Sequence, residues 1–401
     1  MKILLLNLYY PPDTSATAKM AATVVKALAA KHDVTVVCGR PSYDPAERRP
    51  WRLWQTERSG RVTILRVGST DYPRFRMRRR VQNYLTYVAL AVPRALFMPC
   101  DVVLAMTDPP FEGIVGAFVA LLKRKPYAYN IRDLYPDMAL GGGLIRPGLF
   151  ARVWERLHRW ALRRAKRVIV LGDDMRERIT AKGVDAARVT VVRDGTAIAS
   201  QDILAPELDP EVIRTIRGDF RFVLLHAGNL GFYGAWETLL AAARGLEANG
   251  VGLVFVGDGA ERNRLVAQAS GCKAVRFLPF FPASKISSVL AAGDVHVITV
   301  KPGLEGLVVP SKLYGILAAG RPILVVATSE TDAARIVMSR GCGIAVDPEK
   351  PSDMMDAVRR MSRDAGWLQQ LGEAARAAAL EYDKVLELGK FVRVIGEVAE
   401  G

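Results

Sequence analysis

Short apolar runs rich in β-branched residues recur along this chain, and helical patterns of apolar residues separate them. Strand alternating with helix is typical of parallel sheets that carry helices on both faces. The rhythm occurs twice, with charged and turn-forming residues at 196–219 between the two series. The first series predicts strands at 2–8, 34–37, 62–67, 102–105, 127–131, 168–171 and 189–192, and the second at 222–226, 252–256, 274–278, 295–300, 323–327 and 344–346.

The two series predict two Rossmann-like α/β domains with a cleft between them. We place the boundary within 199–221, which assigns residues 1–199 to an N-terminal domain and 200–380 to a C-terminal domain. The Ala-rich helical pattern of 367–400 has no strand after it, so its end at 381–401 either caps the second domain or crosses back to the first. Ligands of such folds bind at the carboxyl ends of the strands, so the cleft is the expected site.

Composition adds limits to this picture. The 401 residues are 50% hydrophobic and 24% charged, which is ordinary for globular domains. No apolar run approaches the ~20 residues that a bilayer span needs, so we expect no transmembrane helix. The four cysteines show no CxxC spacing, which favours a reducing cytoplasm and predicts no metal site.

Charge is distributed unevenly. Residues 1–200 hold 34 Lys and Arg against 17 Asp and Glu, a balance of +17, whereas the remainder carries −2. A basic surface attracts nucleic acid, anionic lipid or a phosphorylated substrate, and charge alone does not choose among them. The first domain is therefore expected to meet the anion.

The turn after the first strand reads YPPDTSATA and lacks the GxGxxG spacing of a dinucleotide site. It presents Asp13, Thr14 and Ser15 just before a helical pattern. Side chains at that place either cap free backbone N–H groups or contact a substrate. The sequence leaves both interpretations open.

Glycine-rich turns follow the strands of the second series. The turn at 226–234 reads HAGNLGFYG and precedes a helical pattern at 235–249. Glycines let backbone amides approach a phosphate, and the following helix adds its positive end. The turns at 257–259, 279–281 and 301–303 are each compatible with a purely structural role, but their convergence favours a phosphate site.

The segment 307–322 reads LVVPSKLYGILAAGRP, with a Pro-Ser helix start and an Ala-Gly-Arg-Pro helix stop. Ser311 and Lys312 then lie at a helix N-terminus. A lysine there is unfavourable beside the helix dipole unless an anion is close, and a diphosphate would supply that charge. The alternative is an exposed lysine. The four histidines occur singly, and we interpret each as structural.

These motifs together resemble glycosyltransferase family 4 of the GT-B fold, especially its branch of bacterial polysaccharide and O-antigen transferases. The resemblance spans nearly the whole chain and rests on YPPD, TDPP from Thr107, RDLYPD at 132–137, GNLG at 228–231, VGDG at 256–259 and PSK to AAGRP at 310–322.

The resemblance implies metal-independent transfer of a hexose or N-acetylhexosamine, with retention at the anomeric carbon, from a nucleotide diphosphate that is usually UDP. No cofactor is expected, and no DxD motif is present. The residues assigned to donor binding are Gly228, Asn229, Leu230, Gly231, Gly257, Asp258, Phe280, Phe281, Lys301, Pro310, Ser311 and Lys312, and those assigned to acceptor binding are Asp13, Thr14, Ser15, Asp108, Arg132 and Asp133.

Two departures from the family pattern matter. The usual pair of glutamates falls at Leu307 and Gly315, and Glu305 is out of register, so the carboxylate expected on the donor ribose is absent. The usual Arg and Lys of the glycine turn correspond to Asn229 and Tyr233. Lys301 or Lys312 is then left to neutralise the diphosphate as a point charge.

Catalytic roles fall on Lys312 and on Asp133, which with Arg132 follows the predicted strand at 127–131. A carboxylate there can accept a proton from, or hydrogen-bond, the attacking hydroxyl. The alternatives for Asp133 are a salt bridge with Arg132 or a cap on a helix at 134–138.

A basic segment precedes a short apolar, aromatic-bearing helical pattern at 81–92. Arginines beside an amphipathic helix are typical of attachment to an anionic membrane surface, whereas the alternative is a buried core helix with a solvated basic lead-in. A second basic helical pattern at 152–167 adds charge, although its apolar stripe is more typical of packing on its own sheet. The residues assigned to membrane contact are Arg74, Arg76, Arg78, Arg79, Arg80 and Tyr84.

The sequence therefore predicts an enzyme, peripheral on the cytoplasmic face of the cell membrane, that transfers sugar from a nucleotide sugar to a polyprenyl-diphosphate-linked saccharide. A second hypothesis is a GT-B protein that binds nucleotide sugar or glycan without transfer, as the residues Leu307 and Gly315 suggest. A nucleic-acid-binding protein rests on charge alone and lacks any recognisable motif, so no nucleic-acid partner is expected.

Overall fold

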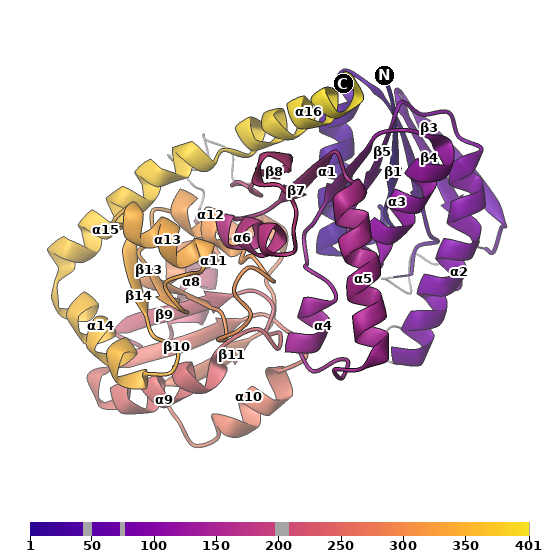
Figure 1. The fold of residues 1–401 in the computed structure, drawn as a ribbon. Coiled ribbons are helices and arrows are strands. Elements are labelled where there is room, and N and C mark those ends of the chain that lie inside the picture. Colours follow the sequence, from indigo (N-terminus) through magenta and orange to yellow (C-terminus); the bar gives the residue numbers. More distant parts are fainter. Residues whose placement is uncertain (43–49, 73–76, 197–207, 401) are drawn as a thin grey trace. The chain divides into compact units, whose positions relative to one another are not determined.

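The computed structural model describes residues 1–42, 50–72, 77–196 and 208–400. The chain forms two compact units, of which the first comprises Met1–Val192 with Leu386–Gly401 and the second comprises Arg193–Val385. The boundary expected at 199/200 lies outside the described residues, and the second unit continues five residues past the expected end at 380. Figure 1 shows the elements of both units.

Eight strands form the sheet of the first unit within its described residues, in the order β3-β4-β2-β1-β5-β6-β7-β8. All neighbours are parallel except β3, which runs antiparallel to β4. The strands are β1 Lys2–Leu6, β2 Asp33–Cys38, β3 Trp54–Ser59, β4 Val62–Val67, β5 Val102–Ala105, β6 Tyr127–Asn130, β7 Arg167–Val170 and β8 Val189–Val191.

Among the strands of the described residues, β3 is the one that the hydrophobic pattern missed. Its sequence WQTERS is polar, and most of its residues are exposed because it forms the edge of the sheet. It is joined to β4 by a tight turn at Gly60, whose φ of 56° suits glycine. An edge strand of charged residues needs no apolar run.

Helices cover both faces of this sheet. Core residues of α1 and α16 pack with Ile3, Leu5 and Val34, whereas α3 packs against the alternate residues Ala105 and Tyr127, which face the other side. On that second side α3 lies between α2 and α5 and contacts both (Figure 1). The helices are α1 Ala16–Ala29, α2 Met77–Leu96, α3 Glu112–Lys123, α4 Asp137–Gly141, α5 Leu149–Arg164, α6 Asp173–Ala181, η2 Ala186–Arg188 and α16 Lys384–Glu400.

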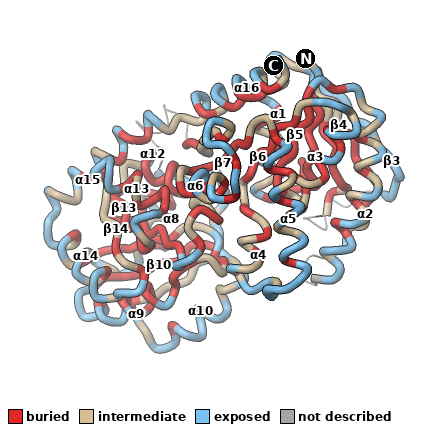
Figure 2. Tube along the Cα trace, viewed as in Figure 1, coloured by how far each residue is buried: buried red, intermediate tan, exposed pale blue. Residues whose placement is uncertain are grey.

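The sheet of the second unit is parallel throughout, in the order β11-β10-β9-β12-β13-β14 among the described residues. The four inner strands of this sheet are almost wholly buried, whereas the edge strands β11 and β14 are mostly half-buried (Figure 2). The strands are β9 Phe222–Ala227, β10 Val251–Val256, β11 Val275–Leu278, β12 Val295–Thr299, β13 Ile323–Val326 and β14 Gly343–Val346. The helices are α8 Pro210–Arg217, α9 Trp236–Leu246, η3 Glu247–Asn249, α10 Arg262–Gln268, η4 Ala283–Lys285, α11 Ile286–Ala292, α12 Lys312–Ala318, α13 Asp332–Ser339, α14 Pro351–Arg363, α15 Ala365–Ala379 and η5 Leu380–Tyr382.

The C-terminal helical stretch is interrupted. The short 3-10 turn η5 separates α15 from α16, and Asp383 after it forms a bridge with Thr196. From Leu386 onward the chain belongs to the first unit, where Phe391 and Ile395 lie in the core beside α1. The segment therefore contributes apolar side chains to the N-terminal unit.

Candidate functional site

Two glycine turns interlock at the carboxyl edge of the second sheet. Gly228 follows β9 with a φ of 146°, and Gly257 follows β10 with a φ of 152°. A Cβ on Gly257 would lie 2.0 Å from the carbonyl oxygen of Gly228. Both positions therefore require glycine, for backbone conformation and for close approach.

The hydrogen bonds of these turns correct the role that the sequence suggested. The N–H groups of Gly228, Leu230 and Gly257 donate to the carbonyl oxygens of Val256, Asp258 and Leu278 at 2.9, 2.8 and 2.9 Å. These three amides are used within the protein, so they do not form a phosphate cradle. The glycines instead allow the two turns to pack, and they leave room for Lys312.

Lys312 is the first residue of α12, and its ammonium group points back over the glycine turn. Its Nζ lies 2.8 Å from Nε2 of His226, and a Cβ on Gly228 would be 3.0 Å from the same Nζ. The residue is partly buried, which contradicts the exposed-lysine alternative. Burial lowers the pKa of Lys312 from 10.5 to about 7.

His226 lies within β9 and is fully buried. Its Nδ1 is 3.2 Å from the carbonyl oxygen of Val297, which can only accept, so Nδ1 carries the proton and Nε2 accepts from Lys312. Burial, followed by the charge of Lys312, holds the pKa of His226 well below its usual value, so the ring stays neutral. The sequence did not predict the contact between His226 and Lys312. Its only signal there was a polar residue within an apolar strand.

The N-terminus of helix α12 contributes less to the attraction of an anion than the sequence suggested. The helix spans seven residues, and the hydroxyl of Ser311 at its N-cap makes no capping hydrogen bond. The charge of Lys312 is therefore the stronger attraction for an anion. Leu307 is buried, whereas a Cβ on Gly315 would meet only Leu290 Cδ1 at 3.8 Å.

The other donor candidates divide into two groups. Phe280 is exposed, and its ring lies 3.3 Å from the Cβ position of Gly257, so it borders the turns. Phe281 packs against a core cluster instead. Four further candidates have exposed side chains at this edge, namely Asn229, Asp258, Lys301 and Ser311. Gly231 lies under Tyr233, and Pro310 is half-buried.

The structure gathers two acceptor candidates in the first unit. Asp108 follows β5 and Asp133 follows the adjacent strand β6, at the carboxyl edge of their sheet. Burial and then the charges of Asp133 and Asp108 raise the pKa of Tyr135, so both carboxylates lie near that phenol. The N-cap of α4 is Pro136, which uses no side chain, so Asp133 is not the N-cap residue of that helix. Arg132, beside it, is half-buried.

The three residues before α1 are mainly structural. The hydroxyl of Ser15 accepts from the N–H of Ala18 at 3.0 Å and caps the helix. Asp13 is buried and its Oδ1 accepts from the N–H of Ser42 at 2.9 Å. Of the three, Thr14 alone is exposed.

The membrane candidates change most. Arg74 and Arg76 lie outside the described residues, whereas Arg78 and Arg79 are exposed. The hydroxyl of Tyr84 accepts from Arg80 Nε, and the Tyr84 ring packs edge-on against Phe111. Tyr84 is only 5% exposed, so its assignment to membrane contact is wrong. Among the described helices, none is both long and apolar enough to cross a bilayer.

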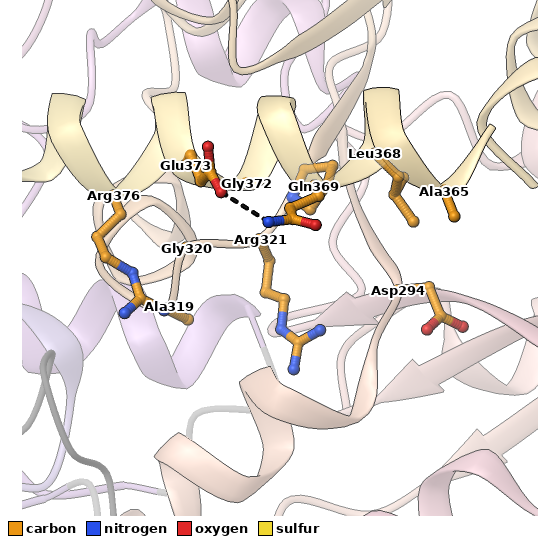
Figure 3. Close-up of a pocket in the computed structure, with 11 residues that line it drawn as sticks. Asp294, Ala319, Gly320, Arg321, Ala365, Leu368, Gln369, Gly372, Glu373 and Arg376 are labelled. Atoms are coloured by element: carbon orange, nitrogen blue, oxygen red, sulfur yellow. Dashed lines mark hydrogen bonds between the residues drawn. The ribbon is translucent and has the colours of Figure 1, made fainter.

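A separate pocket of about 590 Å³ opens at the amino edge of the second sheet (Figure 3). Asp294 and Pro322, which directly precede β12 and β13, line it with residues of α15. Gln369 in its wall donates to Glu373 at 2.8 Å. The residues assigned to donor binding lie at the opposite, carboxyl edge of the sheet, so this pocket is not the proposed donor site.

Comparisons with known proteins agree with this architecture. Residues 15–195 match the model of the glycosyl transferase 4-like domain, and residues 221–364 match that of the glycosyl transferases group 1. The chain is 26% identical over 302 residues to the Pseudomonas aeruginosa protein named "Probable glycosyltransferase WbjE", covering 74% of each chain. It is 25% identical over 374 residues to the Escherichia coli protein named "Putative colanic acid biosynthesis glycosyl transferase WcaI", covering 90% of this chain and 92% of WcaI.

Solved structures are similar in fold. HepE from Anabaena in complex with UDP superimposes with a TM-score of 0.68 at 18% identity, covering 99% of this chain and 100% of HepE. The complex of HepE with UDP-glucose gives a TM-score of 0.69. The two parallel-sheet α/β units are therefore those of the GT-B fold.

Proposed function

We propose that this chain, which belongs to the family 4 glycosyltransferases of the GT-B fold, acts in bacterial polysaccharide biosynthesis. In this proposal it moves a sugar from a UDP-sugar to a polyprenyl-diphosphate-linked saccharide at the cytoplasmic face of the membrane. The observation that carries the donor half is the pair formed by Lys312 and His226. The ammonium of Lys312 lies at the carboxyl edge of a parallel sheet, where ligands of such folds bind.

The desolvated lysine suits a diphosphate. Because burial already disfavours the charged form of Lys312, an anion beside Nζ gains more than it would beside a fully solvated lysine. Phe280 offers an exposed aromatic face near the same turns for a nucleoside. The complexes of HepE with UDP and with UDP-glucose support UDP as the nucleotide.

The acceptor half rests on Asp133. In the proposed reaction the acceptor oxygen bonds to the anomeric carbon from the same face that the diphosphate leaves, so the configuration is retained. The bond from that carbon to the diphosphate oxygen breaks with its electron pair, and the hydroxyl proton passes to the Asp133 carboxylate. Lys312 then stabilises the charge on the departing nucleotide, without a metal ion.

A thermal-shift series over UDP-, GDP- and dTDP-sugars tests the donor site, since a ligand of the folded state raises the melting temperature. A UDP-sugar is expected to stabilise the wild type and Lys350→Met, a control at an exposed lysine, but not Lys312→Met. Equal stabilisation of all three by a UDP-sugar would remove Lys312 from the site. Transfer that persists in EDTA is the expected result for a reaction without a metal.

A second candidate function is binding of nucleotide sugar or glycan without transfer. Leu307 and Gly315, which replace the expected carboxylates, favour it. Incubation with UDP-sugars and membrane extract separates the two hypotheses, because transfer releases UDP. Thermal stabilisation without any UDP release would establish the binding protein and contradict the enzyme.

A further inference from the structure

Large apolar side chains lie exposed along α3 and α5 of the first unit. On α5, Leu149 and Phe150 are 71% and 67% exposed. An apolar stripe on a basic helix is expected to be buried, yet the buried residues of α5 are Ala151, His158, Ala161 and Leu162. We call the exposed set the α3–α5 face, which comprises Phe118, Leu121, Leu122, Leu149, Phe150, Val153 and Leu157.

A groove of about 460 Å³ deepens this face. Its lining is almost wholly apolar and comes from three neighbouring helices, with Val88 and Val92 from α2, Ile114 and Phe118 from α3, and Leu157 and Trp160 from α5. The three helices pack side by side over one face of the sheet (Figure 1). Exposed apolar surface of this continuity marks an interaction site.

Basic residues flank the apolar stripe. Along α5, Leu149, Val153 and Leu157 recur at helical spacing on one side. Arg152, Arg156, Arg159 and Arg163 recur at the same spacing on the adjoining side, and Glu155 is the one acidic residue of this helix. Exposed positions follow α5 along its length (Figure 2).

The apolar stripe and the adjoining row of arginines indicate the kind of partner that this face binds. Apolar side chains beside a row of arginines match the boundary of an anionic bilayer, where acyl chains and phosphate headgroups adjoin. A second copy of this chain fits less well, because it would bring the same arginines together. A soluble acidic protein would leave the groove without an apolar partner.

We propose that the α3–α5 face docks on an anionic lipid bilayer, with its apolar side chains among the acyl chains and the α5 arginines on the headgroup phosphates. The inference deepens the proposed function, because the lipid-linked acceptor of that proposal lies in such a membrane. It moves the contact from Tyr84 of α2 to α3 and α5.

Sedimentation with vesicles tests the apolar half of the proposal. Wild-type protein is expected to sediment with vesicles of phosphatidylglycerol and phosphatidylcholine, and the double variant Leu149→Ser/Phe150→Ser is expected to bind about tenfold or more weakly. The matched control is Leu380→Ser/Met338→Ser, whose residues are 65% and 57% exposed outside the first unit. Equal binding by the two double variants would overturn the proposal.

Charge reversal tests the basic half. Arg156→Glu is expected to weaken binding to the anionic vesicles, whereas Arg214→Glu, an exposed helical arginine of the second unit, is expected to bind as wild type. Binding to pure phosphatidylcholine at the same strength as to anionic vesicles would contradict a headgroup contact. A wild-type dimer in gel filtration that Leu149→Ser/Phe150→Ser dissociates would also overturn the proposal.

Nucleotide binding measured on the same variants without vesicles separates this proposal from the proposed function. Stabilisation by the UDP-sugar is expected to persist in Leu149→Ser/Phe150→Ser, because the α3–α5 face is in the first unit and Lys312 is in the second. If vesicles bind but no nucleotide does, the docking face stands and the proposed function fails. If the reverse holds, docking fails and the donor site stands.

Discussion

The ammonium of Lys312 is 2.8 Å from Nε2 of His226, although the two residues are 86 positions apart in the chain. The histidine is buried in a strand and is kept neutral, so it offers a lone pair to the lysine rather than a competing charge. The lysine is thereby held over the glycine turn at the carboxyl edge of the sheet. Donor binding is expected to depend on both residues.

Donor affinity should depend on pH through Lys312. Its pKa of about 7 means that the free protein loses the ammonium charge as the pH rises through 7, while a bound diphosphate favours the charged form. Affinity for UDP is therefore expected to fall above pH 7, by up to about tenfold per pH unit. Calorimetric titrations from pH 6 to 9 on wild type and Lys312→Met check this, and equal slopes in the two proteins would contradict it.

His226 should act as a positioning residue. His226→Phe keeps the aromatic contact with Trp236, whose ring centroid is 4.9 Å away, but removes the acceptor for Lys312. We expect KM for the donor to rise by roughly tenfold, the effect of about one hydrogen bond to a charged group. His226→Gln, which retains an acceptor, should recover part of the loss. A purely structural role would instead lower the melting temperature of both variants and leave the KM of the folded enzyme unchanged.

Asp133 should affect transfer without affecting donor binding. Asp133→Asn removes the carboxylate that accepts the proton in the proposed reaction, so we expect the transfer rate to fall about 100-fold or more. Stabilisation by a UDP-sugar should remain, since Lys312 belongs to the other unit. Asp173→Asn, at the start of α6, serves as a control for loss of one carboxylate in the same unit. An Asp133→Asn enzyme of normal rate would exclude the catalytic role.

Two glycines should respond in opposite ways to alanine. Gly257→Ala would place a Cβ 2.0 Å from the Gly228 carbonyl oxygen at a φ of 152°, so we expect a loss of about 2 kcal/mol or more in the free energy of unfolding. Gly315→Ala fills open space inside α12 and is expected to gain roughly 0.5 kcal/mol, because alanine favours the helix. Urea unfolding of both variants measures the difference. If Gly315→Ala were destabilising, the protein would require glycine at this position, although the packing around Gly315 indicates no such requirement.

Glu112 gives stability its own pH dependence. Burial raises its pKa from 4.5 to about 8, and its Oε1 accepts from the hydroxyl of Tyr87 at 2.9 Å. Because the pKa of Glu112 is higher in the folded than in the unfolded protein, the protonated carboxyl stabilises the folded state. This contribution to the free energy of unfolding is full below pH 4.5 and is lost as the pH rises through 8. Glu112→Gln keeps the acceptor, so its stability relative to wild type should increase between pH 5 and 8 by on the order of a few kcal/mol. Parallel pH profiles of unfolding for the two proteins would refute the assignment.

The sequence by itself determined where the buried strands lie. Each apolar run that it assigned to a strand is a strand among the described residues, because a parallel strand covered on both faces must be apolar along its length. The polar strand β3 left no such signal, since an edge strand at the surface satisfies its backbone without a buried face. Motif order was likewise sufficient to indicate the family.

Only the tertiary structure decided what individual side chains do. The glycines at 228 and 257 fit both a phosphate cradle and a packed turn, and the choice depended on which carbonyls their amides meet. The partner of His226 lies 86 residues away, and the burial of Tyr84 and exposure of Leu149 depend on neighbouring helices. Periodicity records which face of an element is apolar, but contacts between distant segments decide whether that face is covered.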